Sequence, residues 1–177
     1  MTAAGFPNLA TPEMELLYAC VAPQPTLGSV VRSIDWTRFL QLATNHHVVP
    51  LVHRNLRNAE RNGWPIPGEY LAYLQRLCQG IAASNLRATG ILHRLQAGLA
   101  AEGIQAVPIK GPALAVLAYG DTALRQFEDL DLLVPQEDMP RAVAWLERDG
   151  YVAGELPAAA NRARYFASLQ DWSLQKT

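Results

Sequence analysis

The segment 109–134 most constrains the fold of this chain, because it predicts two short apolar strands joined by a glycine turn and a helix. The first strand ends in Lys110, and Gly111 leads directly into the helix. The second strand carries Asp129 and Asp131. Because side chains alternate along a strand, these two carboxylates are expected to lie close together on one face.

Two carboxylates at this spacing indicate metal-dependent phosphate chemistry. When both are ionised they repel each other, and a divalent cation relieves that repulsion. Hard oxygen ligands suit Mg²⁺, while the free N–H groups at the start of the helix after Gly111 favour an anion. A metal site and a phosphate cradle are the two parts that nucleotidyl transfer requires. On spacing alone, a structural role for Asp129 and Asp131 is an equally good interpretation.

The composition predicts a folded protein with no general affinity for nucleic acid or membranes. Half of the 177 residues are apolar, which is enough for the core of one domain or of two small ones. A net charge of −1 offers no basic field, so nucleic acid is a weak candidate partner. No apolar run approaches the roughly 20 residues that span a bilayer, and the first residues lack a secretory signal, so we expect a cytoplasmic protein. Cys20 and Cys78 are expected to be reduced thiols.

The first hundred residues predict helices, and the pattern changes at Gly103. Thr11 and Asp35 are expected to cap the first two helices, and Pro50 is expected near the start of the third. A long apolar repeat then predicts one helix over 69–101. The remaining predicted elements are strands over 104–109 and 130–134 and helices over 112–119 and 139–149.

Several other polar residues have structural interpretations. His46, His47 and His53 have no acidic or cysteine partner at metal-binding spacing, so a structural or surface role is favoured. Asp121 is expected to cap a turn, and contact with the substrate is its second interpretation. Arg125 has two open interpretations, as an ion-pair partner of one of the two aspartates in the apo protein and as a ligand for phosphate.

A specific pattern of motifs lies within 109–151: Ile-Lys-Gly-Pro-Ala-Leu, Tyr-Gly-Asp, then Arg125, Asp-Leu-Asp-Leu-Leu-Val, and a helix that ends in Asp-Gly-Tyr. This pattern resembles an uncharacterised bacterial nucleotidyltransferase branch of the polymerase-beta-like nucleotidyltransferase superfamily, and the similarity covers most of residues 12–152. The resemblance implies an α+β fold. An N-terminal helical region, residues 1–102, would precede a small mixed β-sheet nucleotidyltransferase-like core, residues 103–177, flanked by helices.

The resemblance also implies a reaction and the residues that carry it. Asp129 and Asp131 would be the catalytic carboxylates and the first two ligands of Mg²⁺ or Mn²⁺. Lys110, Gly111 and Arg125 would line the phosphates of a nucleoside triphosphate (NTP), the expected substrate. A nucleoside monophosphate would pass to a hydroxyl acceptor. Whether that acceptor is a protein, a small molecule, an antibiotic or RNA cannot be read from the sequence.

One departure from the superfamily pattern bears on activity. The superfamily uses a third carboxylate on a later strand, where relatives usually have an acidic residue followed shortly by His-Trp. The only late acidic–aromatic pair here is Asp171-Trp172, whose surroundings do not resemble a core strand. We therefore expect a truncated form, a short form that has lost activity, or a form that completes its site from a second copy or a partner protein. The alternative function is a catalytically inactive nucleotidyltransferase-like module for binding or interaction.

Overall fold

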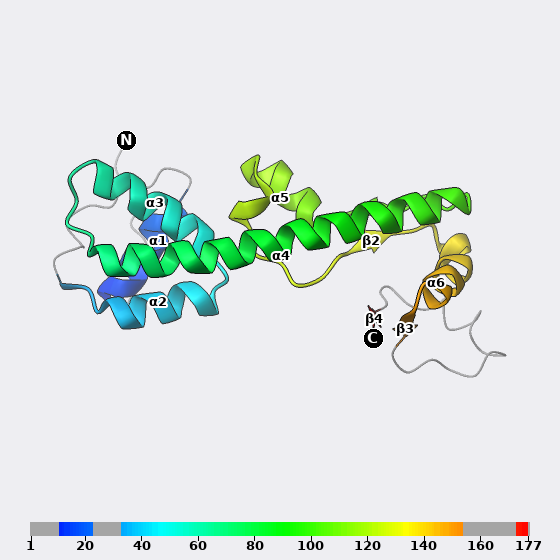
Figure 1. The fold of residues 1–177 in the computed structure, drawn as a ribbon, viewed down its shortest axis with the longest axis horizontal. Coiled ribbons are helices and arrows are strands. Elements are labelled where there is room, and N and C mark those ends of the chain that lie inside the picture. Colours follow the sequence, from blue (N-terminus) through cyan, green and yellow to red (C-terminus); the bar gives the residue numbers. More distant parts are fainter. Residues whose placement is uncertain (1–10, 23–32, 154–172, 177) are drawn as a thin grey trace. The chain divides into compact units, whose positions relative to one another are not determined.

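The computed structural model describes residues 11–22, 33–153 and 173–176, which belong to two compact units (Figure 1). The N-terminal unit comprises Met1–Arg87 and Gly111–Glu128, and the C-terminal unit comprises Ala88–Lys110 and Asp129–Thr177. Each unit combines two separate stretches of chain, and neither division falls at Gly103. A boundary between a helical region, 1–102, and a core region, 103–177, therefore stays a prediction.

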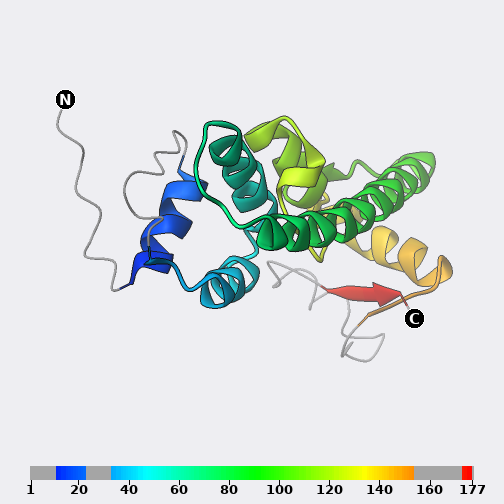
Figure 2. The same ribbon diagram turned by 60° about the vertical axis from the view of Figure 1, so that its left-hand side comes forward.

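Helices make up the described part of the N-terminal unit (Figure 2). Local signals start the first two as predicted, since Thr11 Oγ1 accepts a hydrogen bond from the Met14 N–H at 3.4 Å. In the same way, Asp35 Oδ1 accepts a hydrogen bond from the Arg38 N–H at 3.1 Å. The elements of this unit are α1 (Pro12–Val21), α2 (Trp36–Asn45), α3 (Val49–Arg61), the first part of α4 (Gly68–Ala101), α5 (Gly111–Tyr119) and the 3₁₀ helix η2 (Thr122–Leu124).

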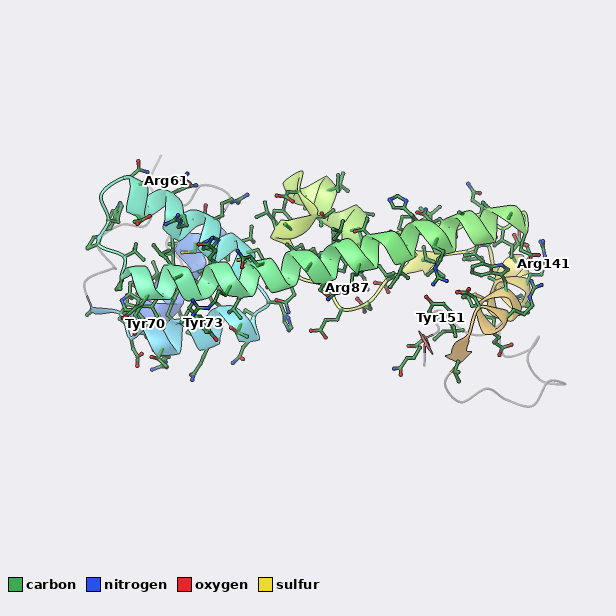
Figure 3. The ribbon with its side chains drawn as sticks, in the orientation of Figure 1. Arg61, Tyr70, Tyr73, Arg87, Arg141 and Tyr151 are labelled. Carbon is green, nitrogen blue, oxygen red and sulfur yellow. The ribbon has the colours of Figure 1, made fainter. Side chains whose placement is uncertain are left out.

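The core of the N-terminal unit forms between α1, α2, α3 and the start of α4. Phe39, Leu56 and Leu74 are fully buried in it. At its edge, Trp36 of α2 stacks on Tyr70 of α4, with the ring centroids 5.6 Å apart. Figure 3 labels Tyr70 on α4. The apolar stripes that predicted these helices therefore meet in one shared core.

Both cysteines are free thiols in this unit, Cys20 buried and Cys78 half-buried. Burial raises the pKa of Cys20 to about 12 and the pKa of Cys78 to about 11. Because the thiolate is the reactive form, we expect both residues to resist iodoacetamide near neutral pH in the folded protein and to react readily in urea. Mass spectrometry after quenched labelling measures this difference. Rapid labelling of Cys20 in the folded protein would contradict its burial.

The C-terminal unit combines helices with short strand pairs. Leu99, Ile104 and Ala142 form its core, and Trp145 packs against them. Strand β1 pairs with β2, and β3 pairs with β4; both pairs are antiparallel, so the described strands form two small sheets rather than one mixed sheet. The elements are the last part of α4, β1 (Val107–Pro108), β2 (Leu132–Leu133), the 3₁₀ helix η3 (Gln136–Asp138), α6 (Met139–Arg148), β3 (Tyr151–Ala153) and β4 (Leu174–Lys176).

Helix α4 runs without a break over Gly68–Ala101, which confirms the long helix that the apolar repeat predicts. Within the C-terminal unit, its Arg94 forms an ion pair of 2.9 Å with Asp149 at the end of α6. The described residues include no helix with both the length and the apolar character needed to cross a membrane.

Candidate functional site

The β1–β2 pair determines the positions of Lys110 and Asp131 in the C-terminal unit. The two strands are antiparallel, with Pro108 opposite Leu132. The Ile109 N–H then donates a hydrogen bond of 3.1 Å to the carbonyl of Asp131. Backbone pairing therefore continues for one residue beyond the strands and places Asp131 next to the end of β1.

The two faces of this strand pair have different surroundings. Leu132 and Val134 pack against the core of the C-terminal unit. The opposite face is open, and its Ile109 and Leu133 are 50% and 60% exposed. Residues directly opposite each other in an antiparallel pair share a face, so Asp131 lies on the open face with Ile109.

Asp131 has an ion-pair partner but no hydrogen bond to one of its oxygens. Lys110 Nζ lies 3.5 Å from Asp131 Oδ2. This oxygen is shielded from solvent, and it accepts no hydrogen bond from any described group. A carboxylate oxygen withdrawn from water is normally satisfied by hydrogen bonds or by a cation. Asp131 is therefore suited to bind an additional positive charge.

Asp129 lies outside the hydrogen-bonded strand, because the strands are shorter than predicted. Strand β2 covers Leu132–Leu133 instead of 130–134, and β1 covers Val107–Pro108 instead of 104–109. The side chain of Asp129 is exposed. A shared face for the two aspartates therefore stays a prediction.

Gly111 and Arg125, the other two predicted phosphate ligands, belong to the N-terminal unit. Gly111 begins α5 with a φ of 55°, a left-handed conformation that glycine adopts without strain. Arg125 follows η2, and its Nη1 is shielded from solvent with no hydrogen-bond partner among the described residues. A peptide bond joins Lys110 to Gly111. The approach of these groups to the two carboxylates in space stays a prediction.

Asn85 of α4 contacts this region, and the motif pattern did not identify it as functional. Its side chain is 1% exposed. Its Nδ2 donates hydrogen bonds to the carbonyls of Thr122, at 2.7 Å, and Arg125, at 2.8 Å. A sequence signal existed, since Asn85 is a polar residue at a core-facing position of the apolar repeat.

Asp121 has the capping role that the sequence predicts, and His53 is a partly buried histidine near Arg57. Asp121 Oδ1 accepts a hydrogen bond of 2.8 Å from the Ala123 N–H and caps η2. Burial, and then the charge of nearby Arg57, lower the pKa of His53. In the part of the chain that the structure describes, no group of three or more His, Cys, Asp or Glu side chains is arranged to hold a metal ion. Asp171 lies outside that part.

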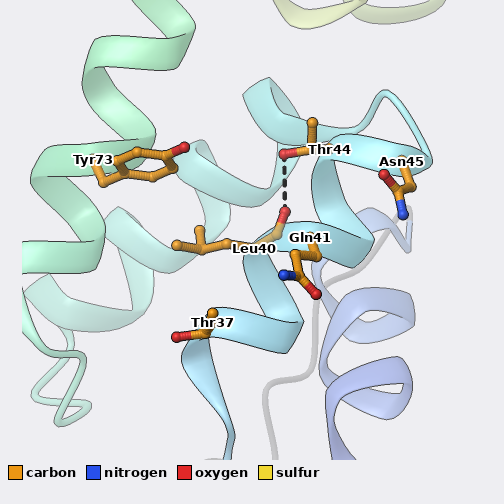
Figure 4. Close-up of a pocket in the computed structure, with 6 residues that line it drawn as sticks. All are labelled: Thr37, Leu40, Gln41, Thr44, Asn45 and Tyr73. Atoms are coloured by element: carbon orange, nitrogen blue, oxygen red, sulfur yellow. Dashed lines mark hydrogen bonds between the residues drawn. The ribbon is translucent and has the colours of Figure 1, made fainter.

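A pocket of about 380 Å³ in the N-terminal unit contains none of the predicted site residues (Figure 4). It lies between α2 and Tyr73 of α4, and Thr44 Oγ1 there donates a hydrogen bond of 2.9 Å to the Leu40 carbonyl. Its lining carries hydroxyl and amide groups without a charge, so it offers no cation for a triphosphate. The lining residues are Thr37, Leu40, Gln41, Thr44, Asn45 and Tyr73.

Comparison with known proteins finds a family that covers most of the chain. The family described as "Uncharacterised nucleotidyltransferase" matches residues 32–174. That range includes Asn85 and all five predicted site residues. No curated protein and no solved structure matches the chain.

Proposed function

The chain belongs to the uncharacterised nucleotidyltransferase family, and we propose that it transfers a nucleoside monophosphate from an NTP to a hydroxyl acceptor with Mg²⁺ or Mn²⁺. One observation carries this proposal beyond the family. The shielded Oδ2 of Asp131 accepts no hydrogen bond and lies 3.5 Å from the amine of Lys110. A metal cation at the carboxylate and a phosphate at the lysine would satisfy both charges.

Asp129 and Asp131 are the proposed metal ligands. Mg²⁺ in proteins usually keeps several waters and binds one or two carboxylates together with substrate phosphate oxygens, so two aspartates suffice for one ion. Bound there, the ion would neutralise negative charge on the reacting phosphates. The exposed side chain of Asp129 leaves room for water and substrate oxygens in such a shell.

Lys110, Gly111 and Arg125 are the proposed phosphate ligands. A metal ion at Asp131 would compete with Lys110 for the carboxylate, so the lysine amine becomes available to a phosphate oxygen. Glycine at the start of α5 allows a phosphate to approach the free backbone N–H groups. The planar guanidinium of Arg125 can contact two phosphate oxygens at once.

In the proposed reaction, an acceptor hydroxyl attacks the α-phosphorus of the NTP. A new oxygen–phosphorus bond forms, the bond to the bridging oxygen breaks, and pyrophosphate leaves with the electron pair. The proton of the hydroxyl passes to a base, the role of the third carboxylate in the superfamily. The described residues place no third acidic side chain in a metal-binding group, so we assign this base to none of them.

The alternative function is a module that binds a nucleotide or a protein without transfer. It is favoured because no third acidic side chain joins a metal-binding group among the described residues. Val116 and Leu117 of α5 are 54% and 85% exposed. Exposed apolar side chains next to one another suit contact with a partner protein or a second copy of the chain.

Metal-dependent nucleotide binding is the first test. We expect calorimetry to detect binding of at least one of ATP, CTP, GTP and UTP in the presence of Mg²⁺ or Mn²⁺, and we expect EDTA to remove the metal-dependent part of that binding. Pyrophosphate release with α-labelled NTPs then separates the two functions. Release supports the transferase, and binding without release supports the module. Absence of metal-dependent binding to all four NTPs would contradict the transferase and the nucleotide-binding form of the module.

A further inference from the structure

Asn85 is a buried polar residue at a position where the rest of the helix face is apolar. It follows Leu71 and Leu74 along the core-facing stripe of α4, and its side chain is 1% exposed. A buried side-chain amide costs stability unless its polar groups are hydrogen-bonded. The groups that accept hydrogen bonds from the two N–H groups of Nδ2 therefore indicate the role of Asn85.

Both donors hold the short segment that carries Arg125. Nδ2 donates to the carbonyl of Thr122, the first residue of η2, and to the carbonyl of Arg125, the residue that follows it. An amide nitrogen has two N–H groups in a fixed plane, so both are used here. Asp121 caps the same segment through the Ala123 N–H. All of these residues belong to the N-terminal unit.

The guanidinium of Arg125 is held with one nitrogen unsatisfied. Nη1 is shielded from solvent, and among the described residues it has no hydrogen-bond partner. Withdrawing a charged donor from water without an acceptor is unfavourable, and an anionic oxygen in its place recovers the lost interaction. The segment is therefore fixed in a form that an anion stabilises.

We propose that Asn85 is a positioning residue for nucleotide binding: its amide fixes the backbone at Arg125, so that the guanidinium is already placed for a phosphate of the NTP. This role rests on the proposed function, in which Arg125 binds phosphate. Holding a ligand group in place before binding improves affinity, because less conformational entropy is lost when the nucleotide binds.

The test is a double-mutant cycle between Asn85 and Arg125, measured by calorimetry with Mg²⁺ and the NTP that the unmodified protein binds best. Asn85→Leu has a similar volume and removes both donors. We expect it to weaken NTP binding about ten- to a hundredfold, as small displacements of a positioned group do. In an Arg125→Ala background, the same change should have an effect of less than about twofold, because its target is gone.

Asn55 provides a matched control in the same unit. It is also buried, and its Nδ2 donates a hydrogen bond of 2.6 Å to the carbonyl of Cys20. Asn55→Leu should lower the melting temperature by a similar amount to Asn85→Leu and leave the NTP dissociation constant unchanged. If Asn85→Leu does not fold, Asn85→Ser is the second variant, because it keeps one hydroxyl donor. Its effect on NTP binding should also depend on Arg125, with a smaller coupling than that of Asn85→Leu.

The outcomes separate this inference from the proposed function. Equal losses of affinity in the unmodified and Arg125→Ala backgrounds would overturn the positioning role while leaving the nucleotide site intact. A loss of affinity from Asn55→Leu equal to that from Asn85→Leu would also overturn it, because general destabilisation would then explain both. No metal-dependent NTP binding by the unmodified protein would overturn the proposed function and this role with it.

Discussion

Replacement of Gly98 by alanine should destabilise the C-terminal unit by a net of about 1 kcal/mol, although alanine is the better helix former. A Cβ at this position would lie 2.0 Å from Cζ2 and 2.4 Å from Cη2 of Trp145. These are atoms of a ring packed on the core of the unit, so the ring and α6 must move to relieve the clash. Overpacking of this kind costs about 1–3 kcal/mol, which outweighs the gain of about 1 kcal/mol in helix propensity.

Gly90 provides the matched control on the same helix. An added Cβ there meets nothing within 4 Å. Gly90→Ala should therefore stabilise the protein by up to about 1 kcal/mol through helix propensity alone. Urea unfolding followed by circular dichroism measures both changes as shifts of the midpoint. Stabilisation by both substitutions would show that α4 and α6 do not approach each other as closely as the structure indicates.

A second variant identifies Trp145 as the cause. Trp145→Leu removes the ring and should lower stability by itself, since it loses contacts with the core. In that background, Gly98→Ala should lower the free energy of unfolding much less than it does in the unmodified protein. The double-mutant cycle should therefore give a coupling free energy of at least about 1 kcal/mol. Equal costs in the two backgrounds would assign the effect to another neighbour.

Helix boundaries were predictable from the sequence because their causes are local. Thr11 and Asp35 cap the helices that they precede, within three residues of the N–H groups that they bind. Gly150, two residues after the end of α6, has a φ of 87°, a left-handed conformation in which a helix commonly ends at glycine. The apolar repeat likewise predicted α4 to within one residue at its start.

Strand lengths and compact units were not predictable in the same way, because they depend on residues distant in the sequence. Strand β2 ends at Leu133, opposite Val107, where its antiparallel partner β1 begins, and no residue within 130–134 indicates this limit. The contact of Asn85 with Arg125 joins positions 40 residues apart. Sequence reasoning could place Asn85 on a buried stripe but could not identify the carbonyl groups that it binds.

In the candidate site, too, the properties of single residues were predictable and the contacts between distant residues were not. The residue types at Asp129 and Asp131 were sufficient to suggest a cation, because carboxylate chemistry follows from the side chain alone. The partner of Asp131 was not foreseen. Sequence reasoning offered Arg125 for that role, whereas the structure describes an ion pair with Lys110, which the register of β1 and β2 brings within 3.5 Å.

This ion pair leads to the largest effect that we expect on nucleotide binding. Replacing both Asp129 and Asp131 by asparagine should abolish the metal-dependent part of NTP binding and reduce affinity in Mg²⁺ by more than about a hundredfold. Loss of a single residue that merely supports a metal ligand already costs about 10- to 100-fold in affinity. Calorimetry with and without EDTA measures the metal-dependent part directly.

Asp138 serves as the control for a general change in charge. It lies in the same unit and forms an exposed ion pair of 2.8 Å with Arg141. Asp138→Asn removes one negative charge and one surface ion pair, which contributes little to stability. We expect it to leave both the metal-dependent and the metal-independent binding unchanged.

Asp131→Asn alone separates the metal ligand from the lysine partner. In EDTA, this variant should bind ATP a few-fold more tightly than the unmodified protein, because Lys110 no longer has a carboxylate beside it and its amine is available to phosphate. Adding Lys110→Met should remove that gain. In Mg²⁺ the order should reverse, since the metal ligand is missing. If Asp131→Asn lowers affinity equally with and without metal, Asp131 acts through local structure and not as a ligand of the cation.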